Sequence, residues 1–201
     1  MKKNYEMDMC SGPILGNLLT FTIPLIFSGI LQLLFNAADV IVVGRFAGSQ
    51  SLAAVGSTTA LINLMINIFI GLSVGVNVIV ARYYGAKREK DVQDTIHTAM
   101  ALSIVSGLFL IVMGQLLSRP MLELMGTPDD VIDKSTIYMR IIFIGMPANM
   151  IYNFGSAILR AVGDTKRPLY FLTAAGVINV VLNLFFVIMF QMDVAGVALA
   201  T

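Results

Sequence analysis

The feature that most constrains this chain is a long segment without charge near its start. From Met9 to Ala38 no residue carries a formal charge, whereas about 20 apolar residues are enough for a helix to cross the hydrocarbon core of a bilayer. The run predicts a membrane-spanning helix at about 14–44. Hydrophobic residues make up 57% of the sequence and charged residues 12%, which predicts an all-α, polytopic membrane helix bundle.

Polar residues of this first span share one helical face. The face consists of Ser28, Gln32, Asn36 and Asp39. Their spacing of i, i+4, i+8 and i+11 places them on one side of a helix. Polar groups in hydrocarbon are costly, so we expect the face to turn toward a bundle interior or a water-filled cavity. A second interpretation stays open, because Asp39 lies about 15 Å from the middle of the span at 1.5 Å per residue, where a charge at the membrane surface would also be found.

Pro24 lies within the same span. Proline has no backbone N–H, so it cannot donate to the carbonyl of Thr20, and its ring disturbs the preceding turn. We therefore predict a kink at Pro24 that acts as a hinge. A hinge and an acid on one helix suggest a part that moves.

Further apolar segments predict additional spans, separated by charged or turn-forming stretches. These spans are 52–80, 95–118, 137–159 and 169–192, with a sixth starting near 195. Arg119 and Pro120 are predicted to end the third span, and Asp193 and Gly196 to form a turn. Residues 82–94 are predicted to form a surface loop that leads into the start of an amphipathic helix. A spanning helix cannot end after a turn or two, so we expect the sixth to be truncated and the chain to belong to a longer polypeptide.

Glycines and carboxamides recur at helical spacing in the later spans. Gly71 and Gly75 form a GxxxG motif that predicts close helix packing, and Pro147 predicts a break in the fourth span. The carboxamide pairs are Asn63 with Asn67, Asn149 with Asn153, and Asn179 with Asn183. Asn63 and Asn67 are expected to form hydrogen bonds between helices. The oxygens of the other two pairs, on the fourth and fifth spans, suit a proton or a hard monovalent cation together with a carboxylate. Asparagines also join helices by hydrogen bonds of about 0.6 kcal/mol each, and the spacing leaves both interpretations open.

No motif for hydrolysis or nucleotide binding is present. The sequence contains no Gly-x-Ser-x-Gly, no His-Glu-x-x-His and no Gly-x-x-x-x-Gly-Lys, so we expect no enzymatic activity and no organic cofactor. The single Cys10 is expected to be an exposed thiol. A net charge of +1 gives no reason to expect nucleic-acid binding.

The basic residues predict an orientation in the membrane. Two lysines precede the first span, four basic residues lie between the second and third spans, and three follow the fourth, which places nine of the 13 on one side. Cytoplasmic loops are rich in Lys and Arg. We therefore expect a cytoplasmic N-terminus, with Asp39 in the outer half of the first span.

Several segments together resemble a known family. They are VGRFAGSQSLAAVG (43–56), VIVARYYGAKR (78–88), LRAVGDTKRP (159–168), NVVLN (179–183) and GVALAT (196–201). In this order and spacing the chain resembles the N-terminal half of a multidrug and toxic compound extrusion (MATE) transporter. The resemblance implies the N-terminal six-helix lobe of a fold with about twelve helices in two lobes and a central cleft.

The resemblance also implies roles for particular residues. Asp39 would carry ion coupling, with Asn153, Asn179, Asn183 and Thr201 around it, and a Na⁺ ion would lie at Asp39, Asn179 and Asn183. Some members have a second acid where this chain has Asn183. We assign Gln32, Asn36 and Asn149 to the substrate cleft or to a polar helix face, because they lie on the polar faces described above.

The implied activity is Na⁺- or H⁺-coupled antiport that exports drugs or other small organic, often cationic, compounds. The implied protein is a monomer in the plasma membrane, a bacterial inner membrane, in contact with lipid and with the C-terminal lobe of the same polypeptide. Two alternatives are a lipid-linked oligosaccharide flippase of the same superfamily and a membrane scaffold without transport. A flippase would need several cationic residues in its cleft, and Arg140 is the one basic residue within a predicted span.

Overall fold

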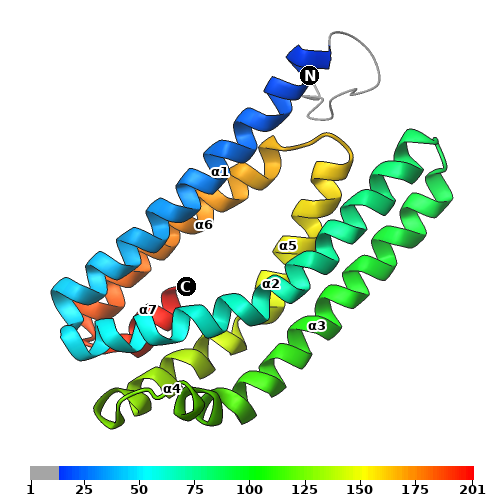
Figure 1. The fold of residues 1–201 in the computed structure, drawn as a ribbon. Helices are drawn as coiled ribbons and strands as arrows, with labels where there is room; N and C mark the ends of the chain where they lie inside the picture. Colours follow the sequence, from blue (N-terminus) through cyan, green and yellow to red (C-terminus); the bar gives the residue numbers. More distant parts are fainter. Residues whose placement is uncertain (1–13) are drawn as a thin grey trace.

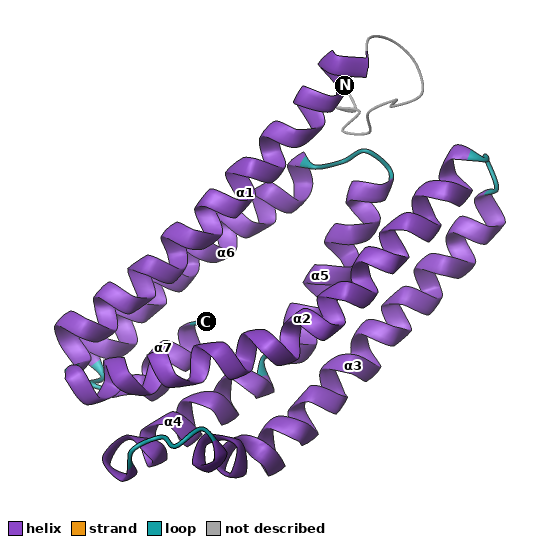
Figure 2. Cartoon of the chain, viewed as in Figure 1, coloured by secondary structure: helices purple, strands orange, loops and turns teal. Residues whose placement is uncertain are grey.

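The computed structural model describes residues 14–201, and this part consists of helices joined by short turns, without a strand (Figures 1 and 2). The helices are α1 (Ile14–Val42), the π-helix η1 (Val43–Ala47), α2 (Ser49–Gly85), α3 (Glu89–Leu124), α4 (Asp129–Ile144), α5 (Met146–Ala161), α6 (Lys166–Leu184), the π-helix η2 (Phe185–Met189) and α7 (Asp193–Ala200). The predictions for Cys10 and for the N-terminus lie outside the described residues.

The helices have the length and composition of membrane spans. Four of them are long and apolar enough to cross a bilayer, and up to five if the bent pair α4 and α5 counts as one span. The predicted all-α membrane bundle is therefore confirmed. The predicted span limits stay predictions, because a helix can extend beyond the hydrocarbon on either side.

Two predicted breaks were wrong. Pro120 lies inside α3, which continues to Leu124. The loss of one backbone hydrogen bond at proline is compatible with this, since Arg119 forms an ion pair at 3.1 Å with Glu123 in the next turn. The helix ends instead at Leu124, and Gly126, with a φ of +70°, is the left-handed residue that follows the C-cap Met125.

The loop predicted at 82–94 is shorter than expected, and the helix start predicted within this stretch lies at Glu89. Only residues 86–88 separate α2 from α3. Arg88 pairs with Asp91 at 2.7 Å and lies 5.1 Å from the ring centre of Tyr83, and acids in the first turn of α3 favour a helix N-terminus. Gly196 lies within α7 and not in the predicted turn.

The break predicted at Pro147 is confirmed. The axes of α4 and α5 meet at 49° around Gly145. Close packing against α3 accommodates this bend, because a Cβ at Gly107 would overlap Pro147 and one at Gly114 would overlap the ring of Phe143.

Gly71 and Gly75 have no such neighbour, since nothing lies within 4 Å of a Cβ at either position. The packing predicted from their GxxxG spacing is therefore wrong within residues 14–201. Asn63 and Asn67 are both exposed and form no side-chain hydrogen bond within this part of the chain.

The helices form two groups that meet at one end. Helix α1 lies along α6, while α2, α3, α4 and α5 pack on one another (Figure 1). The π-helices and α7 connect the groups where α1 and α6 end. The fully buried side chains of the second group include Met139, Phe143, Met150 and Phe154. This arrangement places Asp39 of α1 against Asn183 of α6.

Candidate cation-binding site

The carboxylate of Asp39 is held by a side chain of α6. Asn183 donates a hydrogen bond from Nδ2 to Oδ1 of Asp39. Asn183 is fully buried, and Asp39 is partly buried. The helices approach closely because Gly176, two turns before Asn183, leaves room for the ring of Phe35.

A chain of hydrogen bonds continues from this pair into α7. Asn183 also donates to Oδ1 of Asn179 at 3.4 Å, and Asn179 donates to Oγ1 of Thr201 at 3.3 Å. The hydroxyl of Thr201 donates in turn to the carbonyl of Val197 at 2.9 Å. The structure thus brings together Asp39, Asn183, Asn179 and Thr201, which we call the Asp39 cluster.

One oxygen of the Asp39 cluster is buried without a partner. Among residues 14–201 the carbonyl Oδ1 of Asn183 accepts no hydrogen bond, although buried polar atoms are nearly always satisfied. Carboxylate, carboxamide and hydroxyl oxygens are ligands for a hard cation or partners for a proton, so the residues present fit a Na⁺ ion or a proton. Within residues 14–201 no three His, Cys, Asp or Glu side chains gather as they would around a transition metal.

Asn153 does not join this chain of hydrogen bonds. Its Nδ2 donates to Oδ1 of Asn149 at 2.6 Å and to the Asn149 carbonyl at 2.9 Å, all within α5. Asn149 is exposed and Asn153 partly buried. The carboxamide pair on α5 therefore forms a separate polar site, and its predicted roles stay predictions.

The other polar residues of α1 are less constrained. Gln32 and Asn36 are exposed and form no side-chain hydrogen bond within the described residues. Ser28 donates to the carbonyl of Pro24 at 2.8 Å. Helix α1 runs through Pro24 without interruption, so the predicted hinge stays a prediction.

Two features of the site were missed from sequence. Tyr138, a buried residue of α4, interacts electrostatically with Asp39. The π-helices η1 and η2 begin four residues after Asp39 and two residues after Asn183, and such segments are frequent at functional sites. Nothing in the sequence around Tyr138 indicates that α4 approaches α1, since the buried side of α4 also contains Ser135 and Thr136.

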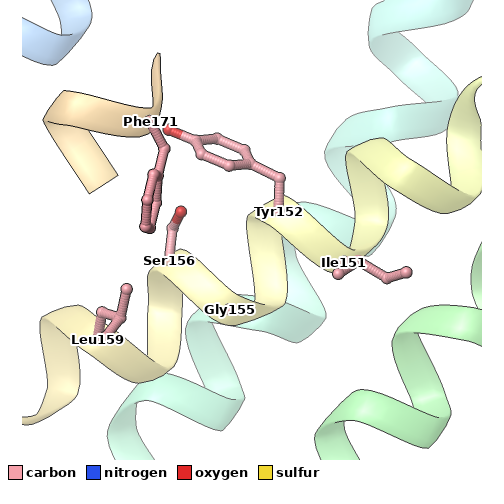
Figure 3. Close-up of a pocket in the computed structure, with 6 residues that line it drawn as sticks. All are labelled: Ile151, Tyr152, Gly155, Ser156, Leu159 and Phe171. Carbon is pink, nitrogen blue, oxygen red and sulfur yellow. The ribbon is translucent and has the colours of Figure 1, made fainter. Parts of the chain in front are cut away.

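Two pockets lie outside the Asp39 cluster. The first, of about 180 Å³, is formed between α5 and α6 by Ile151, Tyr152, Gly155, Ser156, Leu159 and Phe171 (Figure 3). The second, of about 380 Å³, lies beside the π-helices and is lined by Phe46, Val187, Ile188, Gln191 and Asp193. No residue of the Asp39 cluster lines either pocket.

The fold and the site define an all-α, multi-pass membrane protein with a carboxylate held between two helices. Comparison with known proteins identifies its family: the family model described as MatE matches residues 24–185, and the chain belongs to this family. The matched range includes Asp39, Asn179 and Asn183 but not Thr201. Several similar proteins are described as transporters or as multidrug resistance proteins.

Similar proteins of known sequence or structure agree with this assignment. The chain is 36% identical over 162 residues to the probable multidrug resistance protein YoeA of Bacillus subtilis. The aligned region covers 81% of this chain and 35% of YoeA. Crystal structures of a MATE protein in bent and straight conformations superpose with TM-scores of 0.86 and 0.85 at 27% identity, covering 92% of this chain and 41% of each matched chain. The chain thus spans less than half the length of these relatives.

Proposed function

We propose that this chain forms one lobe of a cation-coupled antiporter that exports small organic compounds, and that the Asp39 cluster is its coupling site. The observation that carries the proposal is the buried Oδ1 of Asn183, which has no hydrogen-bond partner in the described part of the chain although Asn183 is bonded to Asp39. The membership in the MatE family and the similarity to a probable multidrug resistance protein support export of organic compounds as the direction of transport.

The donor atoms can serve either Na⁺ or H⁺. A Na⁺ ion would be held by the carboxylate of Asp39 and the carbonyl oxygens of Asn179 and Asn183, with the Thr201 hydroxyl nearby. A proton on Asp39 would instead be donated to the free carbonyl of Asn183. Both events neutralise the carboxylate, and both change the contact that joins α1 to α6.

Movement of α1 would convert this event into a conformational change. Pro24 leaves the carbonyl of Thr20 without its usual helical partner, which makes this turn the softest point of α1. It lies about 22 Å from Asp39 along the axis at 1.5 Å per residue. The bent and straight conformations of the similar MATE protein support a two-state element in this family, and we assign that role in this chain to α1.

The substrate would bind between this lobe and a second lobe of the same polypeptide. The exposed carboxamides of Gln32, Asn36 and Asn149 are candidates for its wall, because they are polar and free to bind within the described residues, apart from the bond of Asn149 to Asn153. The transporter would act as a monomer in the bacterial plasma membrane, with the basic loops in the cytoplasm.

The test uses the full-length transporter in proteoliposomes with an imposed Na⁺ or pH gradient. Asp39→Asn keeps the side-chain shape but cannot ionise, so gradient-driven export of a fluorescent organic cation should be lost while the protein still inserts and binds the dye. Thr20→Val on the same helix is the matched control and should retain gradient-driven export, because the Thr20 hydroxyl donates to the carbonyl of Gly16 within α1. If Asp39→Asn exports dye at the unaltered rate, with the same response to sodium and pH, the coupling role is wrong.

A further inference from the structure

Arg140 lies on an exposed face that α3 and α4 form together. This α3–α4 face consists of exposed side chains of Val112, Leu116 and Arg119 on α3 and of Asp133, Ile137, Arg140 and Ile144 on α4. The two helices are joined here by Gln115, which donates to the main-chain carbonyl of Arg140 at 3.0 Å. The backbone around Arg140 is therefore held firmly against α3.

The guanidinium of Arg140 has no partner within residues 14–201. The acids at the end of this face are already engaged, since Arg119 pairs with Glu123 and Asp133, each at 3.1 Å. The side chains around Arg140 are apolar and exposed: Ile137 is 49% exposed, Ile144 60% and Leu116 68%. An unpaired charge among exposed apolar side chains is costly in a membrane and marks a site that takes a partner.

The position of Arg140 along the helix defines how deep this partner lies. Asp133 and its ion pair with Arg119 mark the polar end of the face. Arg140 follows Asp133 by seven residues, or about 10 Å along the axis at 1.5 Å per residue. Side chains on a helix tilt toward its N-terminus, which for α4 is the polar end, and a long arginine can extend in that direction. A guanidinium extended in this way would lie near the boundary between acyl chains and headgroups.

We propose that Arg140 binds the phosphate of an anionic phospholipid in the leaflet on the side of the α3–α4 turn. A planar guanidinium offers paired donors that match phosphate oxygens, while Leu116, Ile137 and Ile144 contact the acyl chains. Charge complementarity and the apolar surroundings favour a lipid over a carboxylate from another part of the protein. The charge distribution predicts that this leaflet is the outer one. The inference does not depend on ion coupling at Asp39.

The test compares lipid retention by full-length variants. The purified protein is titrated with phosphatidylglycerol or phosphatidylcholine, and bound lipid is counted by native mass spectrometry. Arg140→Gln should lose one tightly held phosphatidylglycerol, with affinity reduced about tenfold or more, as expected for a charge-assisted hydrogen bond of about 1.5–3 kcal/mol. Arg119→Gln removes a charge from the same face but should retain that lipid, since Arg119 is already paired.

A second measurement separates lipid binding from a structural role. Phosphatidylglycerol should raise the thermal unfolding temperature of the native protein more than that of Arg140→Gln, because a ligand of the folded state stabilises it by mass action. The proposal is overturned if Arg140→Gln retains phosphatidylglycerol like the native protein. It is also overturned if the variant is destabilised equally with and without this lipid, which would indicate a carboxylate partner inside the protein.

Discussion

Gly176→Ala tests whether the close contact between α1 and α6 maintains the Asp39 cluster. A Cβ at this position would overlap the ring of Phe35 on α1. Relief requires the ring or the helix to move, and overpacking of this kind costs about 1–3 kcal/mol. The higher helix propensity of alanine offsets at most about 1 kcal/mol of this destabilisation. We therefore expect a net loss of stability and a weaker bond between Asp39 and Asn183.

The assay is thermal unfolding of the full-length protein in detergent, with and without Na⁺. Gly176→Ala should unfold at a lower temperature and gain less stabilisation from Na⁺, because a distorted site binds the ion less tightly. Gly71→Ala is the matched control, since nothing lies within 4 Å of a Cβ at Gly71, and it should be neutral or slightly stabilising.

A double substitution identifies the clash itself. Phe35→Ala removes the ring that the new methyl group would meet, so it should recover part of the stability lost in Gly176→Ala, and the two effects should not add. If Gly176→Ala behaves like Gly71→Ala in both stability and response to Na⁺, the contact does not support the site. The same conclusion follows if Phe35→Ala and Gly176→Ala are simply additive.

Three further predictions concern the site, the α5–α6 turn and the topology. Thr201→Val removes the hydroxyl to which Asn179 donates at 3.3 Å. Because a hydrogen bond contributes about 1 kcal/mol, the apparent affinity for the cation in transport should fall several-fold without loss of expression. An unchanged affinity would exclude Thr201 from the site. Asp164→Ala removes the buried carboxylate that accepts hydrogen bonds from backbone N–H groups at the start of α6. It should lower the free energy of unfolding by about 1–2 kcal/mol in thermal or denaturant unfolding, whereas Asp164→Asn should retain much of the cap. Equal stability of both variants would contradict this prediction. Cysteines introduced at Lys87 and Ser49 on a Cys10-free background should react with a membrane-impermeant reagent from the cytoplasmic and the outer side respectively, and labelling of position 87 in intact cells would reverse the topology.

The membrane class and most of the helices were predictable because they depend on local composition. Uncharged runs longer than a bilayer requires indicate spans whatever the neighbouring helices are. The break at Pro147 was predictable for the same reason, since the missing N–H belongs to the residue itself. Helix ends were less predictable: Pro120 lies inside α3, where a neighbouring ion pair and the glycine cap at Gly126 determine the end.

Packing contacts required the tertiary structure. The GxxxG pair of Gly71 and Gly75 predicted close approach but has no neighbour among the described residues, whereas Gly107, Gly114 and Gly176 do. Close approach depends on which helix faces a glycine, and the spacing of glycines along one helix contains no information about its partner.

The candidate site was likewise predictable only in part. The sequence by itself determined that Asp39, Asn179 and Asn183 lie on polar faces of apolar helices, because the helical period relates residues of one helix to each other. Only the tertiary structure decided that Asn183 bonds Asp39, that Asn179 bonds Thr201 and that Tyr138 interacts electrostatically with the carboxylate. Those contacts join different helices, and their geometry depends on side-chain packing between helices, which no local pattern specifies.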